Sequence, residues 1–249
     1  MLAWGIDDRL ASGIGAGSQI SLYHHWELGV VKQMPAKNTY LPTFWGPTKS
    51  SYWDTVRAAF GTQMPPVILG FNEPDVTGQA NMTPAAAAQL MYDALWVPYG
   101  SRGANLVSPA IAWDVNKWLV PFMKAYTNLG GQVDAIGYHI YLDLNNNTDA
   151  AVAEVEKRVN TLYALFGKKI VLSELGLTQA GGGTDEQIND FVQKVGKFLD
   201  NSDAILGWAL SAVFARGNGW DSYLNSNMSF YYSNNTLTPL ALSYMSEAY

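Results

Sequence analysis

The 249-residue chain contains no cysteine. This absence excludes disulfide frameworks, zinc sites built on thiolates and a thiol nucleophile. Charged residues are also scarce, at 14% of the chain, and they leave a net charge of -6. Such a chain has little with which to neutralise phosphates, so we expect no nucleic-acid partner and no anionic membrane partner.

The sequence also lacks any long apolar run. The longest candidate, residues 204–215, is broken by Gly207 and Ser211 and is shorter than the roughly 20 residues that span a membrane. A hydrophobic fraction of 48% is nevertheless enough for one sizeable core. We therefore expect a single folded domain over residues 1–249, acting as a monomer.

No leader-like segment precedes the first apolar run, which begins directly after Met1, as in a mature segment behind an added initiator. Four Asn-X-Ser/Thr triplets, at Asn81, Asn146, Asn227 and Asn234, permit secretion. We therefore expect a secreted protein that acts outside the cell or in the cell wall.

Eight apolar runs of strand length recur along the chain, each followed by polar, glycine or proline residues. Most are continuous and do not alternate, which is typical of strands buried on both faces of a parallel sheet. The runs are residues 2–6, 20–24, 40–45, 67–71, 106–111, 135–141, 170–173 and 205–213.

Amphipathic stretches lie between the later runs, so strand and helix patterns alternate. Caps and apolar periodicity predict helices that begin near Thr83, ahead of Trp118, at Thr148 and at Thr184, the last with a capping box completed by Gln187. The connections over 7–19 and 27–38 show no clear helical period, and we expect at most trimmed helices there.

Chain length and strand number together favour one α/β architecture. Eight strands in 249 residues give about 31 residues per repeat, which is the size of a βα unit. We therefore predict a closed (β/α)8 barrel, the TIM barrel. The alternative is an open doubly wound sheet, but no glycine-rich phosphate loop follows the first strand.

Two glutamates follow apolar strands, and in such a barrel the reacting groups lie at the C-terminal ends of the strands. Glu73 ends the fourth run and Glu174 ends the seventh. Either residue alone is as readily a cap or an ion-pair partner. Strands four and seven lie on opposite sides of the barrel mouth, however, so the two carboxylates would face each other. A separation of about 5 to 5.5 Å would suit a retaining glycosidase, with one acid/base and one nucleophile.

The residues around these glutamates resemble a known family. Asn-Glu-Pro at 72–74 and Glu-Leu-Gly at 174–176, each at a strand end, resemble glycoside hydrolase clan A. The sequence segments 69–75, 108–110, 134–141 and 173–176 resemble those of glycoside hydrolase family 128, a group of β-1,3-glucanases related to the fungal alkali-sensitive-linkage proteins.

This resemblance implies Glu73 as general acid/base and Glu174 as nucleophile, in an enzyme that needs no cofactor. Glu73 must be protonated to donate to the leaving oxygen, whereas Glu174 must be ionised to attack. Asn72 is suited to hydrogen-bond the sugar 2-hydroxyl, a contact that strengthens as charge develops at the anomeric carbon.

Aromatic residues are abundant, with nine Trp, 14 Tyr and nine Phe. Sugar faces stack on aromatic rings, which offer a large rigid area at little entropic cost. The candidates for a glucan groove, near predicted strand ends, are Trp4, Trp26, Trp45, Trp113 and Trp208.

The three histidines show no metal-binding spacing. His139 and Tyr141 lie two residues apart on the sixth strand and therefore share a face. By similarity to the clan that face lines the site, where either residue could hold Glu174 ionised through a hydrogen bond. His24 ends the second strand and is a candidate for substrate contact.

The sequence thus predicts a retaining, endo-acting β-1,3-glucanase without metal or cofactor. Exo action, another β-linked target such as β-1,4-glucan or mannan, and a non-catalytic glucan-binding protein on the same barrel remain alternatives. A serine hydrolase is disfavoured because no Gly-X-Ser-X-Gly elbow occurs.

Overall fold

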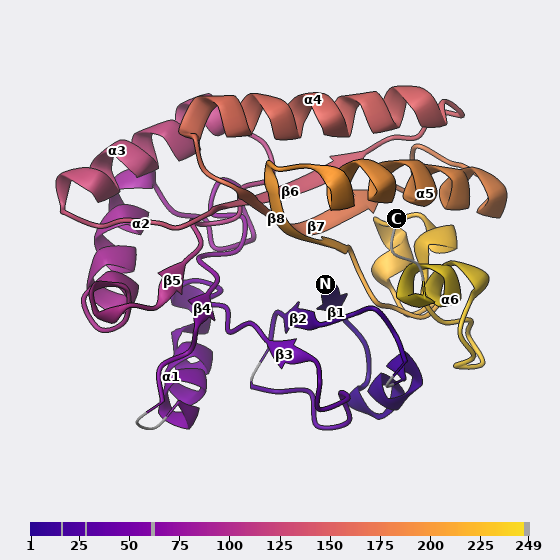
Figure 1. The fold of residues 1–249 in the computed structure, drawn as a ribbon, viewed down its shortest axis with the longest axis horizontal. Coiled ribbons are helices and arrows are strands. Elements are labelled where there is room, and N and C mark those ends of the chain that lie inside the picture. Colours follow the sequence, from indigo (N-terminus) through magenta and orange to yellow (C-terminus); the bar gives the residue numbers. More distant parts are fainter. Residues whose placement is uncertain (16, 28, 61–62, 247–249) are drawn as a thin grey trace. The chain divides into compact units, whose positions relative to one another are not determined.

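The computed structural model describes residues 1–15, 17–27, 29–60 and 63–246 (Figure 1). Residues 16 and 28, which belong to the two connections with no clear helical period, lie outside the described residues. The chain divides into two compact units. Unit 1 comprises residues 1–25, 30–40 and 140–249, and unit 2 comprises residues 26–29 and 41–139.

Unit 1 is built on parallel strands. β1 (Leu2–Trp4), β2 (Leu22–His25) and β3 (Thr39–Tyr40) pair in that order, and β7 (Ile170–Leu177) pairs with β8 (Ile205–Leu210). β6 (Ile136–Leu142), whose last three residues belong to unit 1, is the other neighbour of β7. Val213, just beyond β8, bridges Trp4 in parallel, so β8 also neighbours β1. All eight residues of β7 are buried, as continuous apolar runs predict.

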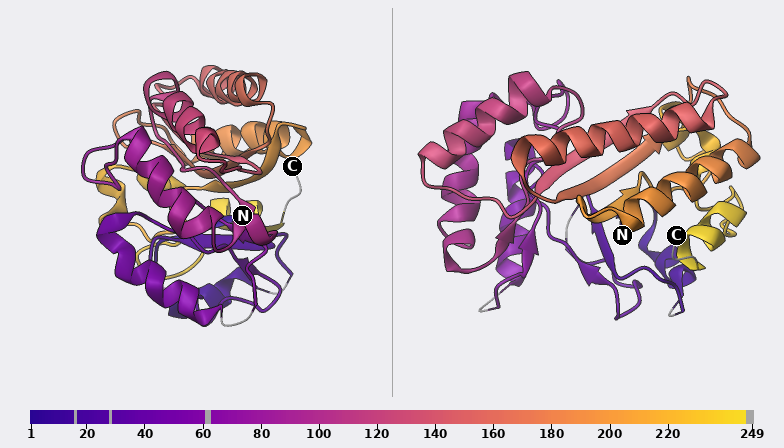
Figure 2. Two further views of the ribbon diagram at one scale, coloured as in Figure 1. Left: turned by 90° about the vertical axis from the view of Figure 1, so that its left-hand side faces the viewer. Right: turned by 45° about the horizontal axis from the view of Figure 1, so that its top comes forward.

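Two long helices, α4 (Thr148–Phe166) and α5 (Asp185–Asn201), lie side by side in unit 1, as Figure 1 and Figure 2 show. The predicted capping box of α5 is present, since the side chains of Thr184 and Gln187 each accept from the other's backbone N–H. α4 ends at Gly167, whose φ of 61° is a left-handed conformation that favours glycine. A further helix, α6 (Pro239–Ser246), was not predicted.

Unit 2 repeats the parallel pattern with shorter strands. β4 (Val67–Ile68) pairs with β5 (Asn105–Leu106), and single parallel bridges join Thr43 to Leu69 and Val107 to Ala135. Its α-helices are α1 (Ser50–Ala59), α2 (Pro84–Met91) and α3 (Val120–Asn128), and π-helical turns Tyr92–Trp96 and Val115–Leu119 adjoin α2 and α3. The predicted spacing of four puts Trp118, Phe122 and Tyr126 in one stack, with ring centroids 5.4 and 5.5 Å apart.

Each of the eight predicted runs contains a strand or a parallel bridge, so the alternating α/β pattern is confirmed. The trimmed helices expected in the two early connections are present only in part. The first holds the 3-10 helix Asp8–Ile14, whereas the described residues of the second hold turns and no helix. Among the described residues, no helix is both long enough and apolar enough to cross a bilayer. The single domain over 1–249 stays a prediction.

Candidate active site

Glu73 follows β4 in unit 2, in a backbone conformation that side chains rarely adopt. Its φ is 43°, in the left-handed region, which costs a residue with a Cβ roughly 1–2 kcal/mol. Two backbone hydrogen bonds hold it there: its N–H donates to the Ala110 carbonyl at 2.8 Å, and its carbonyl accepts from the Val76 N–H at 3.0 Å. The residue is only 8% exposed. A buried carboxyl on strained backbone is a feature that clusters at functional sites.

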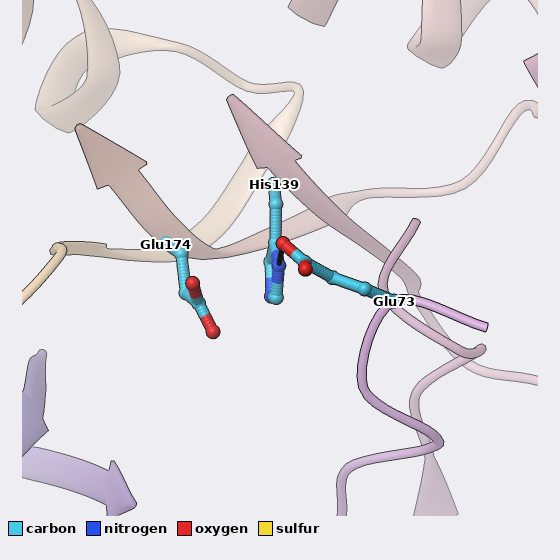
Figure 3. A group of neighbouring side chains, drawn as sticks. All are labelled: Glu73, His139 and Glu174. Carbon is cyan, nitrogen blue, oxygen red and sulfur yellow. Dashed lines mark hydrogen bonds and ion pairs between the residues drawn. The ribbon is translucent and has the colours of Figure 1, made fainter. Parts of the chain in front are cut away.

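The ring of His139, in the unit 2 part of β6, contacts the carboxyl of Glu73. Its Nδ1 lies 2.9 Å from Glu73 Oε1, and both side chains are buried (Figure 3). This contact can hold one proton on either partner: Nδ1–H donates to a carboxylate, and a carboxylic acid donates to the bare nitrogen. The pair is therefore suited to a group that gives up and regains a proton.

Glu174, which Figure 3 also draws, lies in β7 of unit 1 and is 4% exposed. The Tyr141 hydroxyl donates to its Oε2, as expected from the sequence, and the Ser211 Oγ lies 3.5 Å from the same oxygen. The two hydroxyl oxygens are themselves 2.9 Å apart. Hydroxyl donors directed at one buried carboxylate oxygen stabilise its negative charge, which suits a nucleophile.

Gly176 explains how Tyr141 can reach this carboxylate. A Cβ at position 176 would lie 2.8 Å from the Tyr141 ring, so glycine leaves the space that the ring occupies against β7. Tyr223, which is exposed, packs edge-on against the same ring with centroids 5.3 Å apart. Sequence reasoning missed both Ser211 and Tyr223.

His24 lies in the interior of unit 1. Its Nε2 is 2.9 Å from the carbonyl oxygen of Ser173, the residue before Glu174, and the residue is buried. The structure therefore places His24 in the packing between β2 and β7, where it supports the strand that carries Glu174. Its predicted contact with substrate stays a prediction.

Asn72, next to Glu73, is held on both sides within unit 2. The Trp26 indole N–H donates to its Oδ1 at 3.2 Å, and its Nδ2 donates to Gln79 Oε1 at 3.2 Å. Because an indole nitrogen can only donate, the Trp26 contact fixes which end of the Asn72 amide is the oxygen. The amide nitrogen carries two hydrogens, of which the Gln79 bond uses one. Gln79 was not identified from the sequence.

Three predicted groove tryptophans lie in unit 2 with ring surface open to solvent. Trp26 and Trp45 are half-buried, and Trp113 is 60% exposed. Lys49 joins the first two, since its Nζ lies 4.6 Å from the centre of the Trp45 ring and 3.3 Å from the Trp26 carbonyl oxygen. A cation over an indole face stabilises the ring's position.

The other two predicted groove tryptophans are buried in unit 1. Trp208 is 6% exposed, its indole N–H donates to Asp200 of α5 at 2.7 Å, and its ring packs edge-on against Tyr244 of α6. Its prediction as a groove residue is therefore wrong, because the ring is directed at the helices. Trp4 is 3% exposed, and within the described residues its indole nitrogen has no hydrogen-bond partner. Its predicted role is untested.

Comparisons with known proteins place this arrangement in a family. The glycosyl hydrolase catalytic core model matches residues 1–244. Alkali-sensitive linkage protein 1 of Schizosaccharomyces pombe is 34% identical over 114 residues, which are 45% of this chain and 19% of that protein. This chain therefore matches less than a fifth of that relative's length.

Solved structures of family 128 glucanases share the fold. The exo-β-1,3-glucanase of Cryptococcus neoformans is 21% identical, with a TM-score of 0.76 over 100% of this chain and 98% of that one. The curdlan-specific exo-β-1,3-glucanase of Blastomyces gilchristii, in complex with glucose, is 22% identical, with a TM-score of 0.75 over 98% and 97%. An endo-β-1,3-glucanase of Amycolatopsis mediterranei, in complex with laminaripentaose, is 21% identical, with a TM-score of 0.77 over 98% and 97%.

These structural likenesses, each below 25% identity, bear on the fold. The family model bears on the chemistry, because it covers nearly the whole chain. The protein therefore belongs to the glycosyl hydrolase catalytic core family and is a glycoside hydrolase.

Proposed function

We propose that this protein hydrolyses β-1,3-glucan with retention of configuration, as a single-domain (β/α)8 barrel of family 128. The observation that carries the proposal is the pair of buried carboxylates with different partners: Glu73, which follows β4, contacts an imidazole, and Glu174, within β7, accepts from two hydroxyls. The relatives of similar fold that cleave β-1,3-glucan support the choice of substrate. The parallel pairings, which follow chain order within each unit, support the barrel.

The reaction proceeds by two displacements at the anomeric carbon. The Glu174 carboxylate attacks this carbon while Glu73 donates its proton to the leaving glycosidic oxygen, so the sugar becomes esterified to Glu174. Water then attacks the same carbon and gives a proton to Glu73, and the bond to Glu174 breaks. His139 holds Glu73 through both transfers, and the amide N–H of Asn72 is available to the sugar 2-hydroxyl.

We propose endo action within this function. The open rings of Trp26, Trp45 and Trp113 offer stacking area for several glucosyl units, as expected of an enzyme that binds a chain along its length. Exo action is the alternative, because relatives of similar fold include exo-acting enzymes.

The test is to incubate the protein with linear β-1,3-glucan, β-1,4-glucan and mannan and to follow the products by mass spectrometry. We expect oligosaccharides of several lengths from β-1,3-glucan alone, and glucose as the first product would instead indicate exo action. Glu174→Gln should lower the rate by about three orders of magnitude or more. Glu156→Gln, on the outer helix α4, is the matched control and should retain the wild-type rate.

Two results would overturn the proposal. The first is binding of β-1,3-glucan without product from any polymer, which would indicate a glucan-binding protein. The second is an initial product of α configuration in ¹H NMR, since retention requires the β-anomer first.

We also propose that the protein is secreted, which its exposed sequons support. Asn81, Asn146 and Asn234 lie at the surface, whereas the Asn227 side chain is half-buried and donates to the Gly183 carbonyl at 3.0 Å. Expression through a yeast secretory pathway should therefore give glycans on the first three and leave Asn227 bare. Peptide mapping after glycosidase treatment measures the occupancy, and bare asparagines at all four positions would count against the proposal.

A further inference from the structure

The carboxylate of Asp75 accepts hydrogen bonds from three successive backbone N–H groups. Its Oδ1 accepts from Ala112 at 3.1 Å, and its Oδ2 accepts from Trp113 at 2.8 Å and from Asp114 at 3.1 Å. All four residues belong to unit 2. Hydrogen bonds from backbone N–H groups to an ionised carboxylate are among the strong ones in proteins. Asp75 therefore fastens the loop that carries Trp113 to the segment that carries Glu73.

The backbone of Trp113 is fixed while its ring is free. The three bonds to Asp75 hold this backbone, and Ala112 beside it is buried. The Asp114 side chain serves the following turn, where it accepts from the Lys117 N–H at 2.8 Å. Trp113 itself is 60% exposed, the largest exposed fraction of any tryptophan among the described residues. A large apolar ring held out on fixed backbone is preorganised to stack against a ligand.

We propose that Asp75 is a positioning residue for substrate: its carboxylate holds Trp113 as a stacking platform for a glucosyl unit of the bound chain. This inference rests on the proposed function. The same short segment then carries the acid/base, Glu73, and the anchor of the platform two residues later. A loop cap with no part in binding is the competing explanation, since Asp commonly caps loops.

The kinetic test compares Asp75→Ala, Trp113→Ala and the double variant on laminaripentaose. Each single variant should raise KM roughly 2- to 12-fold, the value expected for one aromatic stacking contact, with little change in kcat. The double variant should raise KM no further than Trp113→Ala alone, because both remove the same contact. Asp114→Ala is the matched control, since it removes a cap on the same loop without touching the amide of Trp113, and its KM should stay at the wild-type value.

A second measurement does not depend on turnover. Hydrogen exchange of the amides at 112–114 should accelerate in Asp75→Ala, and binding of laminaripentaose to the Glu174→Gln protein should weaken when Asp75→Ala is added. Asp75→Asn, which preserves side-chain size, replaces Asp75→Ala in both measurements if the alanine variant does not fold.

The outcomes separate the two proposals. If the wild-type protein cleaves no glucan, the proposed function is refuted. The hydrogen-exchange and binding measurements would then still test whether Asp75 positions Trp113. Wild-type KM in Asp75→Ala, unchanged exchange at 112–114, wild-type binding in Trp113→Ala, or a KM that rises equally in Asp114→Ala would each overturn the inference.

Discussion

Glycine in place of Glu73 is expected to give a more stable protein than alanine, which reverses the usual order of the two residues. At φ 43° an alanine keeps the left-handed strain of roughly 1–2 kcal/mol, which glycine does not have. Glycine loses about 0.4–1 kcal/mol more than alanine through the entropy of the unfolded chain. The difference favours glycine at position 73 by about 0.5–1 kcal/mol.

Asn72 supplies the matched control, because its φ is not positive and it lies on the same segment. There alanine should be more stable than glycine by about 0.4–1 kcal/mol. Within each pair both variants lose the same side-chain contacts, so these cancel. The gap between the two pairs, about 1–2 kcal/mol, is then the backbone strain at Glu73 itself.

The assay is urea unfolding of the four variants, monitored by tryptophan fluorescence and circular dichroism, with free energies obtained by linear extrapolation at equal m-values. All position 73 variants should be inactive, so stability and activity are read independently. If alanine exceeds glycine at position 73 by the same margin as at position 72, then the backbone at Glu73 stores no strain and the reasoning is refuted.

Three further predictions address the site and its surroundings. His139→Ala should lower kcat/KM on β-1,3-glucan by about 10- to 150-fold, as loss of a hydrogen bond to a charged group predicts, and far less on an aryl glucoside whose leaving group needs no proton. Steady-state kinetics that show equal losses on both substrates would contradict the link to Glu73. Trp208→Phe should destabilise the fold by about 1–2 kcal/mol, because Asp200 loses one hydrogen-bond donor, and it should leave KM unchanged. A raised KM would indicate that Trp208 contacts substrate after all. Hydrogen bonds from Arg9 lower the pKa of Asp7 from 3.8 to about 2. The Asp7 carboxylate therefore stabilises the fold above pH 4, and this stabilisation is lost as the pH falls through 2. Asp7→Asn should accordingly unfold at a lower temperature than wild type at pH 7, and the difference should shrink as the pH falls from 4 towards 2. A difference at pH 2 as large as that at pH 7 would argue against the ion pair.

The sequence was informative where burial or capping leaves a local pattern. The residues of β7 are buried on both faces, and this requires a continuous apolar run, which is visible without the structure. The capping box of α5 likewise joins residues only three positions apart, Thr184 and Gln187. Glu73 and Glu174 were found for a related reason, because a carboxylate directly after an apolar strand stands out.

The direction of side chains on β8 could not be read from the sequence. Alternation along a strand assumes regular pairing, but Ile170 pairs with Ile205 while Val171 pairs with Gly207. The extra residue in β8 shifts the register, and a shift of one residue moves later side chains to the other face. Trp208 was assigned to a groove because it lies near a predicted strand end, but nearness to a strand end does not determine the face to which the ring points, and the ring lies against the helices. Ser211 was overlooked because it lies inside an apolar run.

Partners that depend on tertiary contact were equally hidden. Gln79 lies in an irregular loop, and nothing in its neighbourhood indicates that it orients Asn72. The pairing of His139 with Glu73 joins residues 66 positions apart. Spacing showed only that His139 shares a face with Tyr141, and either residue was expected to contact Glu174. The structure bears this out for Tyr141, whereas His139 contacts Glu73.

The segment at 72–75 brings these contacts together and explains how strain persists there. Asn72 is held by Trp26 and Gln79, Glu73 by the Ala110 carbonyl, and Asp75 by three N–H groups of another loop. A strained φ survives only where surrounding bonds determine the backbone more fully than one residue needs. Removing one of these anchors should therefore let the backbone at position 73 relax. In an Asp75→Ala background the stability advantage of glycine over alanine at position 73 should shrink, whereas in an Asp114→Ala background, which leaves all the anchors in place, it should keep its full size.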